Sequence, residues 1–174
     1  MDPNDPANPS SALDDEGKSL RERQEEVYHD VVGYLTRRVF PGVSIIPVLD
    51  EGSIMPRSQA PGTREVVQGW ILGALSPWEL AGLERATLAG KSLLGAARLV
   101  VEWSEDGAGI GIGKEGEVFG VEKVARGVSV EVDWQIGRWG EVEDTHDVEK
   151  EDLRRQMGSV VLLVCGEGGK RRGE

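Results

Sequence analysis

The stretch from Arg98 to Gly140 constrains the fold most, because its apolar and polar residues alternate at period two. The alternation is clearest between positions 128 and 136, where apolar Val128, Val130, Val132, Trp134 and Ile136 alternate with polar Ser129, Glu131, Asp133 and Gln135. Glycines and other turn residues separate the runs. This pattern is typical of strands with one buried and one solvated face. We therefore predict a β-meander over residues 98–137.

Three other segments have the composition of strands. Residues 43–50 are short and β-branched, and Pro47 removes a backbone donor, which indicates an edge strand or a bulge. Residues 64–75 are apolar enough to pair back on that strand, with a helix as the alternative. Residues 159–165 form a continuous apolar run, which indicates a buried strand.

Two capping boxes predict where helices begin. Ser19 and Glu22 have the spacing of such a box, and apolar residues follow at helical spacing, so we predict a helix near 19–40. Ser76 and Glu79 repeat the box, and the proline between them suits the first helical position. The second helix is expected near 77–96, where its glycines either permit close packing or break it near residue 90.

A third helix is expected near 146–157, because acidic residues precede basic ones in the order that a helix dipole favours. The elements therefore alternate between helices and hairpin-like groups of strands. That order predicts an α+β fold, in which helices pack on a mostly antiparallel sheet.

Composition and charge limit the organisation and location of the chain. Residues 1–18 are polar and acidic, so we predict a disordered tail, a single domain over 19–166 and a flexible end over 167–174. The net charge of −11 makes nucleic-acid binding an unfavoured alternative. We also predict no membrane segment and no cleaved leader. The lone Cys165 gives no disulfide, and an intracellular protein of the cytoplasm or nucleus is expected.

No recognisable catalytic set or cofactor motif is present, which favours a protein that is not an enzyme. An alternative is a small-ligand or hydrolase-type pocket between the Ser76 helix and the sheet, where His146 with Glu143 and Asp147 would supply a base or a ligand site. Acids at a helix start are expected for capping alone, however, and their spacing matches no metal signature. No metal and no cofactor are predicted.

The tryptophans point instead to an interaction surface. Trp139 lies where the alternation fails, next to Arg138, and Trp134 lies on the same segment. Exposed tryptophan and arginine are frequent in binding hot spots. We therefore predict a non-catalytic protein-binding module, either self-associating as a homodimer or binding another protein. A viral accessory or regulatory protein would fit that class.

Overall fold

The computed structural model describes residues 13–49, 57–105, 107–109, 117–140 and 146–165. These residues form seven α-helices and one 3₁₀ turn, with no strand among them. The first four helices are α1 (Leu20–Arg38), α2 (Thr63–Ala74), α3 (Pro77–Gly90) and α4 (Leu93–Trp103). After the turn η2 (Gly107–Gly109) come α5 (Val121–Val128), α6 (Val130–Trp139) and α7 (His146–Cys165). The predicted α+β fold is therefore wrong, and the described part of the chain is all-α.

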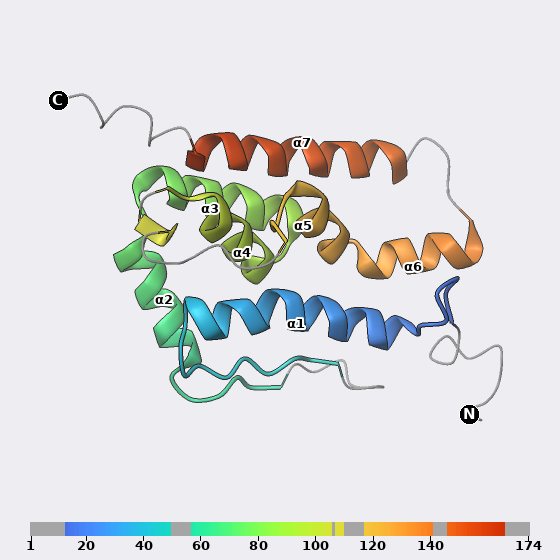
Figure 1. Ribbon diagram of the computed structural model, residues 1–174, viewed down its shortest axis with the longest axis horizontal. Coiled ribbons are helices and arrows are strands. Elements are labelled where there is room, and N and C mark those ends of the chain that lie inside the picture. The colour runs from blue at the N-terminus through green and yellow to red at the C-terminus, as the bar shows by residue number, and fades with distance from the viewer. Residues whose placement is uncertain (1–12, 50–56, 106, 110–116, 141–145, 166–174) are drawn as a thin grey trace.

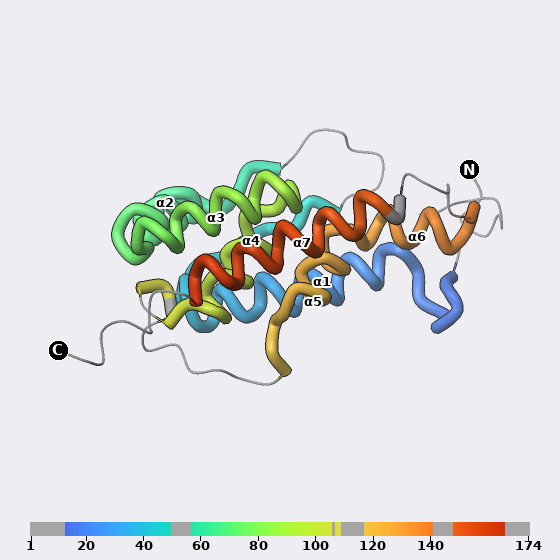
Figure 2. Tube along the Cα trace, turned by 90° about the horizontal axis from the view of Figure 1, so that it is seen from above, coloured from blue at the N-terminus to red at the C-terminus, as the bar shows by residue number. Residues whose placement is uncertain are grey.

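Helix α4 is the centre of the fold. It packs against α1 on one side and against α3, α5 and α7 on the others (Figure 1). Residues 95–102 are all buried, and Leu99 and Val100 have no exposed surface. A helix that is buried on every face must be surrounded by other elements. The view from above shows α7 running along the side of the bundle where α3, α4 and α5 gather (Figure 2).

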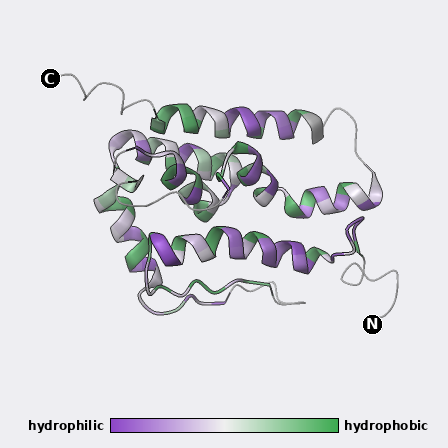
Figure 3. Ribbon diagram, viewed as in Figure 1, coloured by the Kyte–Doolittle hydropathy of each residue, from purple (hydrophilic) through white to green (hydrophobic). Residues whose placement is uncertain are grey.

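Two glycines of α3 allow α7 to approach closely. A Cβ added to Gly82 would lie 2.9 Å from Val164 Cγ1, and one added to Gly90 would lie 2.9 Å from Met157 Cε. Both distances are shorter than ordinary contact, so a larger residue at either position would require a side chain of α7 to move. The second half of α7 is the hydrophobic half (Figure 3), and it supplies Met157, Val160 and Val164 to the core.

Both capping boxes are confirmed. Ser19 and Ser76 each accept a hydrogen bond from the backbone N–H three residues on, and the glutamate there accepts one from the cap residue. The predicted helix near 19–40 is α1. The predicted helix near 77–96 divides at Gly90, since Lys91 adopts φ 51 and α4 begins two residues later.

The predicted meander over 98–137 is wrong, because this stretch contains α4, α5 and α6. Positions 130 and 134 satisfy period two, but they are also four residues apart and so share one face of a helix. Arg98 and Glu102 have the same spacing and form a buried ion pair within α4. A helix explains both the apolar spacing of positions 130 and 134 and the ion pair between Arg98 and Glu102, whereas a strand pattern explains only the apolar spacing.

The three separate strand predictions are also wrong. Residues 64–75 lie almost entirely in α2, and the apolar run 159–165 is the C-terminal part of α7. Periodicity does not distinguish a buried strand from the buried end of a helix. Residues 43–49 have no partner strand within the described ranges, and side chains bind their backbone instead. Gln59 pairs with both the N–H and the carbonyl of Ile46 at 2.8 and 2.9 Å, and Tyr28 Oη donates to Ile45 O at 2.7 Å.

The domain predictions fall partly on residues that the structure does not describe. Residues 1–12 and 166–174 lie outside the described ranges, so the predicted tails and the single domain over 19–166 stay predictions. Residues 13–18, the end of the predicted acidic tail, are described and lie against the start of α1. We call residues 13–18 the N-terminal arm. Among the described residues, no helix has both the length and the apolar character that a membrane crossing requires.

Candidate functional site: a charged cleft between two helices

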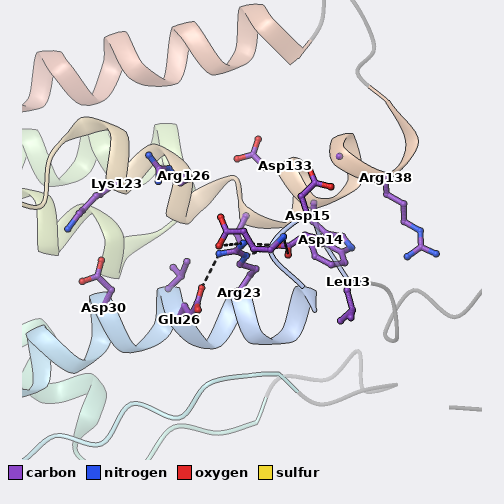
Figure 4. Close-up of a pocket in the computed structure, with 15 residues that line it drawn as sticks. Leu13, Asp14, Asp15, Arg23, Glu26, Asp30, Lys123, Arg126, Asp133 and Arg138 are labelled. Carbon is purple, nitrogen blue, oxygen red and sulfur yellow. Dashed lines mark hydrogen bonds and ion pairs between the residues drawn. The ribbon is translucent and has the colours of Figure 1, made fainter. Parts of the chain in front are cut away.

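A cleft of about 760 Å³ lies between α1 and the α5–α6 segment, and the N-terminal arm closes one end (Figure 4). Fifteen residues line it: Leu13, Asp14, Asp15, Glu16, Arg23, Glu26, Val27, Asp30, Lys123, Arg126, Val130, Asp133, Trp134, Gly137 and Arg138. Its volume is in the range of ligand sites in proteins. Both of its long walls are helices.

The apolar part of the lining comes from both walls. Val130 and Trp134 are half-buried residues four positions apart on α6, and Val27 on α1 is half-buried as well. Val27 also lines a second pocket of about 150 Å³, which lies among α1, α4 and α5 and has almost entirely apolar walls. The cleft therefore offers an apolar surface to a ligand, and the second pocket next to Val27 has room for a ligand side chain.

The charged part of the lining is divided by sign. The arm and α1 contribute the acids Asp14, Asp15, Glu16, Glu26 and Asp30, whereas α5 and α6 contribute the bases Lys123, Arg126 and Arg138. Figure 4 shows Asp30 and Glu26 on α1, on the opposite side of the cleft from Lys123 and Arg126 on α5. Two residues depart from this division. Arg23 lies on the acidic wall, and Asp133 lies on the basic wall, where Lys150 pairs with it at 3.2 Å.

Arg23 holds the N-terminal arm in place. Its guanidinium lies 2.7 Å from Asp14, 2.9 Å from Glu16 and 3.4 Å from Glu26. Hydrogen bonds from Arg23 to Asp14 and then to Glu16 raise the pKa of Arg23. The pKa of the Asp14 carboxyl is lowered, mainly because it accepts the Lys18 N–H. Arg23 is therefore already paired, and because it faces three carboxylates, this end of the cleft keeps a negative charge.

The charges further along the cleft are not paired in this way. Asp30 and Arg126 are exposed, and neither forms an ion pair with another residue in the described part of the chain. Among the residues that the structure describes, Lys123 pairs with the exposed Glu117 alone, at 3.0 Å. The middle of the cleft thus presents an acid and a base on opposite walls, each available to a bound molecule.

The structure brings two of the three predicted interface residues into this cleft. Trp134 and Arg138 both line it, from α6 rather than from the predicted strand. Trp139 is 67% exposed and lies just outside the lining. Sequence reasoning missed Asp30, Lys123 and Arg126. Nothing in the sequence alone tells that these positions on α1 and α5 face one another across a cleft.

A second group of charged residues is buried in the core and was also missed. Arg98 and Glu102 are 3% and 5% exposed and form an ion pair. The Arg98 guanidinium lies 3.5 Å from the centre of the Tyr34 ring and 4.8 Å from that of Phe119. An arginine stacked between rings and paired with a carboxylate joins α1, α4 and the segment before α5.

Glu79 is the other buried acid, with 2% exposure, and it joins three segments. Besides capping α3 through the Ser76 N–H, it accepts the Ser104 hydroxyl and the Ala108 N–H. Its hydrogen bonds use both carboxylate oxygens. Glu79, Arg98 and Glu102 therefore stabilise the fold and lie away from the cleft.

The predicted ligand pocket between the Ser76 helix and a sheet does not form in the described part of the chain, because that part contains no sheet; α3 packs on α4 and α7 instead. Glu143 lies outside the described residues. His146 and Asp147 begin α7, but their side chains are likewise not described. The described residues include no cluster of three or more metal-ligand side chains.

The fold and the cleft thus define an all-α protein with a charged, tryptophan-lined surface between helices. The chain is similar to two mitochondrial proteins of yeasts, both called ATP12. It is 35% identical over 93 residues to that of Saccharomyces cerevisiae, covering 53% of the chain and 27% of the relative. It is 26% identical over 148 residues to that of Schizosaccharomyces pombe, covering 85% of the chain and 44% of the relative. The chain spans less than half the length of these curated relatives. No family model and no solved structure matches it.

These similarities correct two sequence-based predictions. The suggestion of a viral accessory or regulatory protein is wrong, because the relatives are mitochondrial proteins of yeasts. The predicted location in the cytoplasm or nucleus is contradicted by the same finding.

Proposed function

We propose that this chain, like the ATP12 proteins, is a mitochondrial chaperone for ATP synthase assembly, and that it acts by binding an ATP synthase subunit. The observation that carries the proposal is the similarity to the ATP12 protein of Schizosaccharomyces pombe, which extends over 85% of the chain. A similarity of that extent includes α1, α5 and α6 or most of them, since only a seventh of the chain lies outside it.

The cleft is the site that we assign to this function. A chaperone for an unassembled subunit must recognise polypeptide surface that the finished assembly buries, which is apolar with polar edges. The lining of the cleft has that composition, with Trp134 and Val130 beside charged walls. Trp134 and Arg138 are of the residue types that contribute most to protein interfaces, and Trp139 extends the surface beyond the cleft.

The test uses purified ATP synthase subunits, each unfolded in urea and then diluted with or without this chain. We expect at least one subunit to aggregate less in its presence, as measured by light scattering, and to co-elute with it in size-exclusion chromatography. The assembled ATP synthase is the control and should not bind. The proposal is refuted if no subunit aggregates less in the presence of the chain and no subunit co-elutes with it.

Two tryptophan variants locate the site in the same assay. Trp134→Ala removes the aromatic side chain of the cleft and should weaken subunit binding about tenfold or more. Trp78→Ala removes a 50% exposed tryptophan at the start of α3, outside the cleft, and should leave binding unchanged. Equal effects of the two substitutions would contradict the assignment of the cleft.

The predicted homodimer is tested on the chain alone. If Trp139 and Arg138 serve self-association, light scattering after size-exclusion chromatography would show a dimer for the unaltered chain. The double variant Trp139→Ala with Arg138→Ala would then be a monomer. With a net charge of −11, two copies repel one another, which favours a different polypeptide as the partner.

A further inference from the structure

The division of charge across the cleft narrows the kind of polypeptide that it can bind. Asp30 on α1 and Arg126 on α5 are exposed, and within the described residues neither has an opposite charge paired with it. A ligand with charges of one sign would be attracted by one wall and repelled by the other. A ligand with a base on one side and an acid on the other would be attracted by both.

The walls also determine the backbone conformation of the ligand. Both are helices, whose backbone N–H and C=O groups are paired within the helix except at the ends. An extended peptide would therefore find no strand edge to pair with, and its own backbone groups would lose water without compensation. A helical segment satisfies its own backbone and can place one apolar ridge against Val27, Val130 and Trp134.

We propose that the cleft binds an amphipathic helix of the partner polypeptide, with an apolar ridge, a basic flank toward Asp30 and an acidic flank toward Arg126. This inference rests on the proposed function and names the partner's chemistry at the same site. The apolar ridge contacts Val130 and Trp134, and one side chain can enter the 150 Å³ pocket that Val27 shares with the cleft.

The test measures the binding of three synthetic helical peptides to the full chain by fluorescence anisotropy. The peptides have about 18 residues, share one leucine ridge, and differ only in their flanks: lysine on one and glutamate on the other, lysine on both, or glutamate on both. We expect the mixed peptide to bind roughly two- to fivefold tighter than either of the others at low salt. The preference should disappear near 0.5 M salt, where exposed charges are screened.

Charge-reversal variants make the test specific. Arg126→Glu places an acid on each wall in the middle of the cleft, opposite Asp30, so the peptide with two lysine flanks should become the tightest ligand. Asp30→Lys places a base on each wall in the middle of the cleft, opposite Arg126, so the peptide with two glutamate flanks should become the tightest. Both positions are exposed, and loss of folding would not change the order of three peptides in these opposite directions.

Two matched controls lie outside the cleft. Arg85→Glu on α3 and Glu25→Lys on α1 replace exposed residues that do not line it, and both variants should keep the original order. The inference is overturned if the unaltered chain binds no peptide, binds all three equally, or keeps the same order after Arg126→Glu.

The subunit-dilution assay separates this inference from the proposed function. A subunit that binds the chain, together with peptides that show no charge preference, would refute the amphipathic helix and leave the chaperone role intact. Charge-dependent peptide binding without binding of any ATP synthase subunit would support the helix and refute the role.

Discussion

Removing one member of the buried pair Arg98–Glu102 should destabilise the protein far more than removing both. Glu102→Leu leaves the Arg98 guanidinium charged at 3% exposure, without its carboxylate. An uncompensated buried charge of this kind costs about 3–5 kcal/mol. For a chain of this size, that loss lowers the melting temperature by roughly 10 °C.

The double substitution Arg98→Met with Glu102→Leu removes the charge together with its partner. Apolar replacement of a buried pair is often close to neutral, although the contacts of Arg98 with the rings of Tyr34 and Phe119 are lost, at about 1 kcal/mol. We therefore expect the double variant to be more stable than Glu102→Leu alone by about 2 kcal/mol or more.

Urea unfolding followed by circular dichroism measures these differences. Glu122→Leu is the control, because Glu122 pairs with Arg154 at the surface and its side chain is 62% exposed; the cost there should stay below about 1 kcal/mol. The reasoning fails if Glu102→Leu costs no more than this control, or if the double variant is no more stable than Glu102→Leu alone.

Three further predictions test the packing of the helices and the N-terminal arm. Gly69→Ala, in open space on α2, should stabilise by about 0.5–1 kcal/mol, whereas Gly82→Ala, against α7, should destabilise by about 1–3 kcal/mol in urea unfolding; the same sign for both would contradict the packing argument. Gly107→Ala should cost about 2 kcal/mol or more, because φ is +38° and the new Cβ would lie 2.7 Å from a backbone carbonyl oxygen; an unchanged unfolding midpoint would exclude that crowding. The pKa of Asp14 is lowered below 3.8, mainly because its carboxylate accepts the Lys18 N–H. This hydrogen bond is therefore kept at neutral pH, and it is lost as the pH falls through the lowered pKa and the carboxylate is protonated. The NMR shift of the Lys18 amide should accordingly titrate with a midpoint below 3.8, and a midpoint above it would argue against the arm contact.

The sequence predicts helix starts well where a local mechanism fixes them. The boxes at Ser19 and Ser76 depend only on residues three apart, so α1 and α3 begin where expected. The break after Gly90 is also a local event, since Lys91 adopts a left-handed conformation there. Such signals need no knowledge of the rest of the chain.

The remaining helices depend on long-range packing, and all or part of each was mistaken for a strand; the first part of α7, near 146–157, was predicted as a helix. Val130 and Trp134 fit both periods, and α6 has no buried residue to separate the alternatives. In α4 the decisive signal was present, because Arg98 and Glu102 are spaced as helical neighbours. Weighing that ion-pair spacing against the apolar composition would have favoured a helix.

The candidate site could be predicted only in part for the same reason. Trp134 and Arg138 stand out by residue type and lie in the cleft. Asp30 and Arg126 are ordinary surface charges in the sequence, and they become candidate binding residues only because α1 and α5 face one another across the cleft. No local pattern carries that information.

Site-specific photo-cross-linking tests the central claim most directly. A photoreactive residue replaces Gly137, which lines the cleft, or Gly69, which lies on α2 outside it; both are exposed positions with open space around them. Each protein is irradiated with an unassembled ATP synthase subunit, and the cross-linked peptides are identified by mass spectrometry. We predict cross-links from position 137 to an amphipathic helical segment of the subunit, and none from position 69. Cross-links from position 69 alone, or from neither position while the subunit binds, would contradict the assignment of the cleft as the binding site.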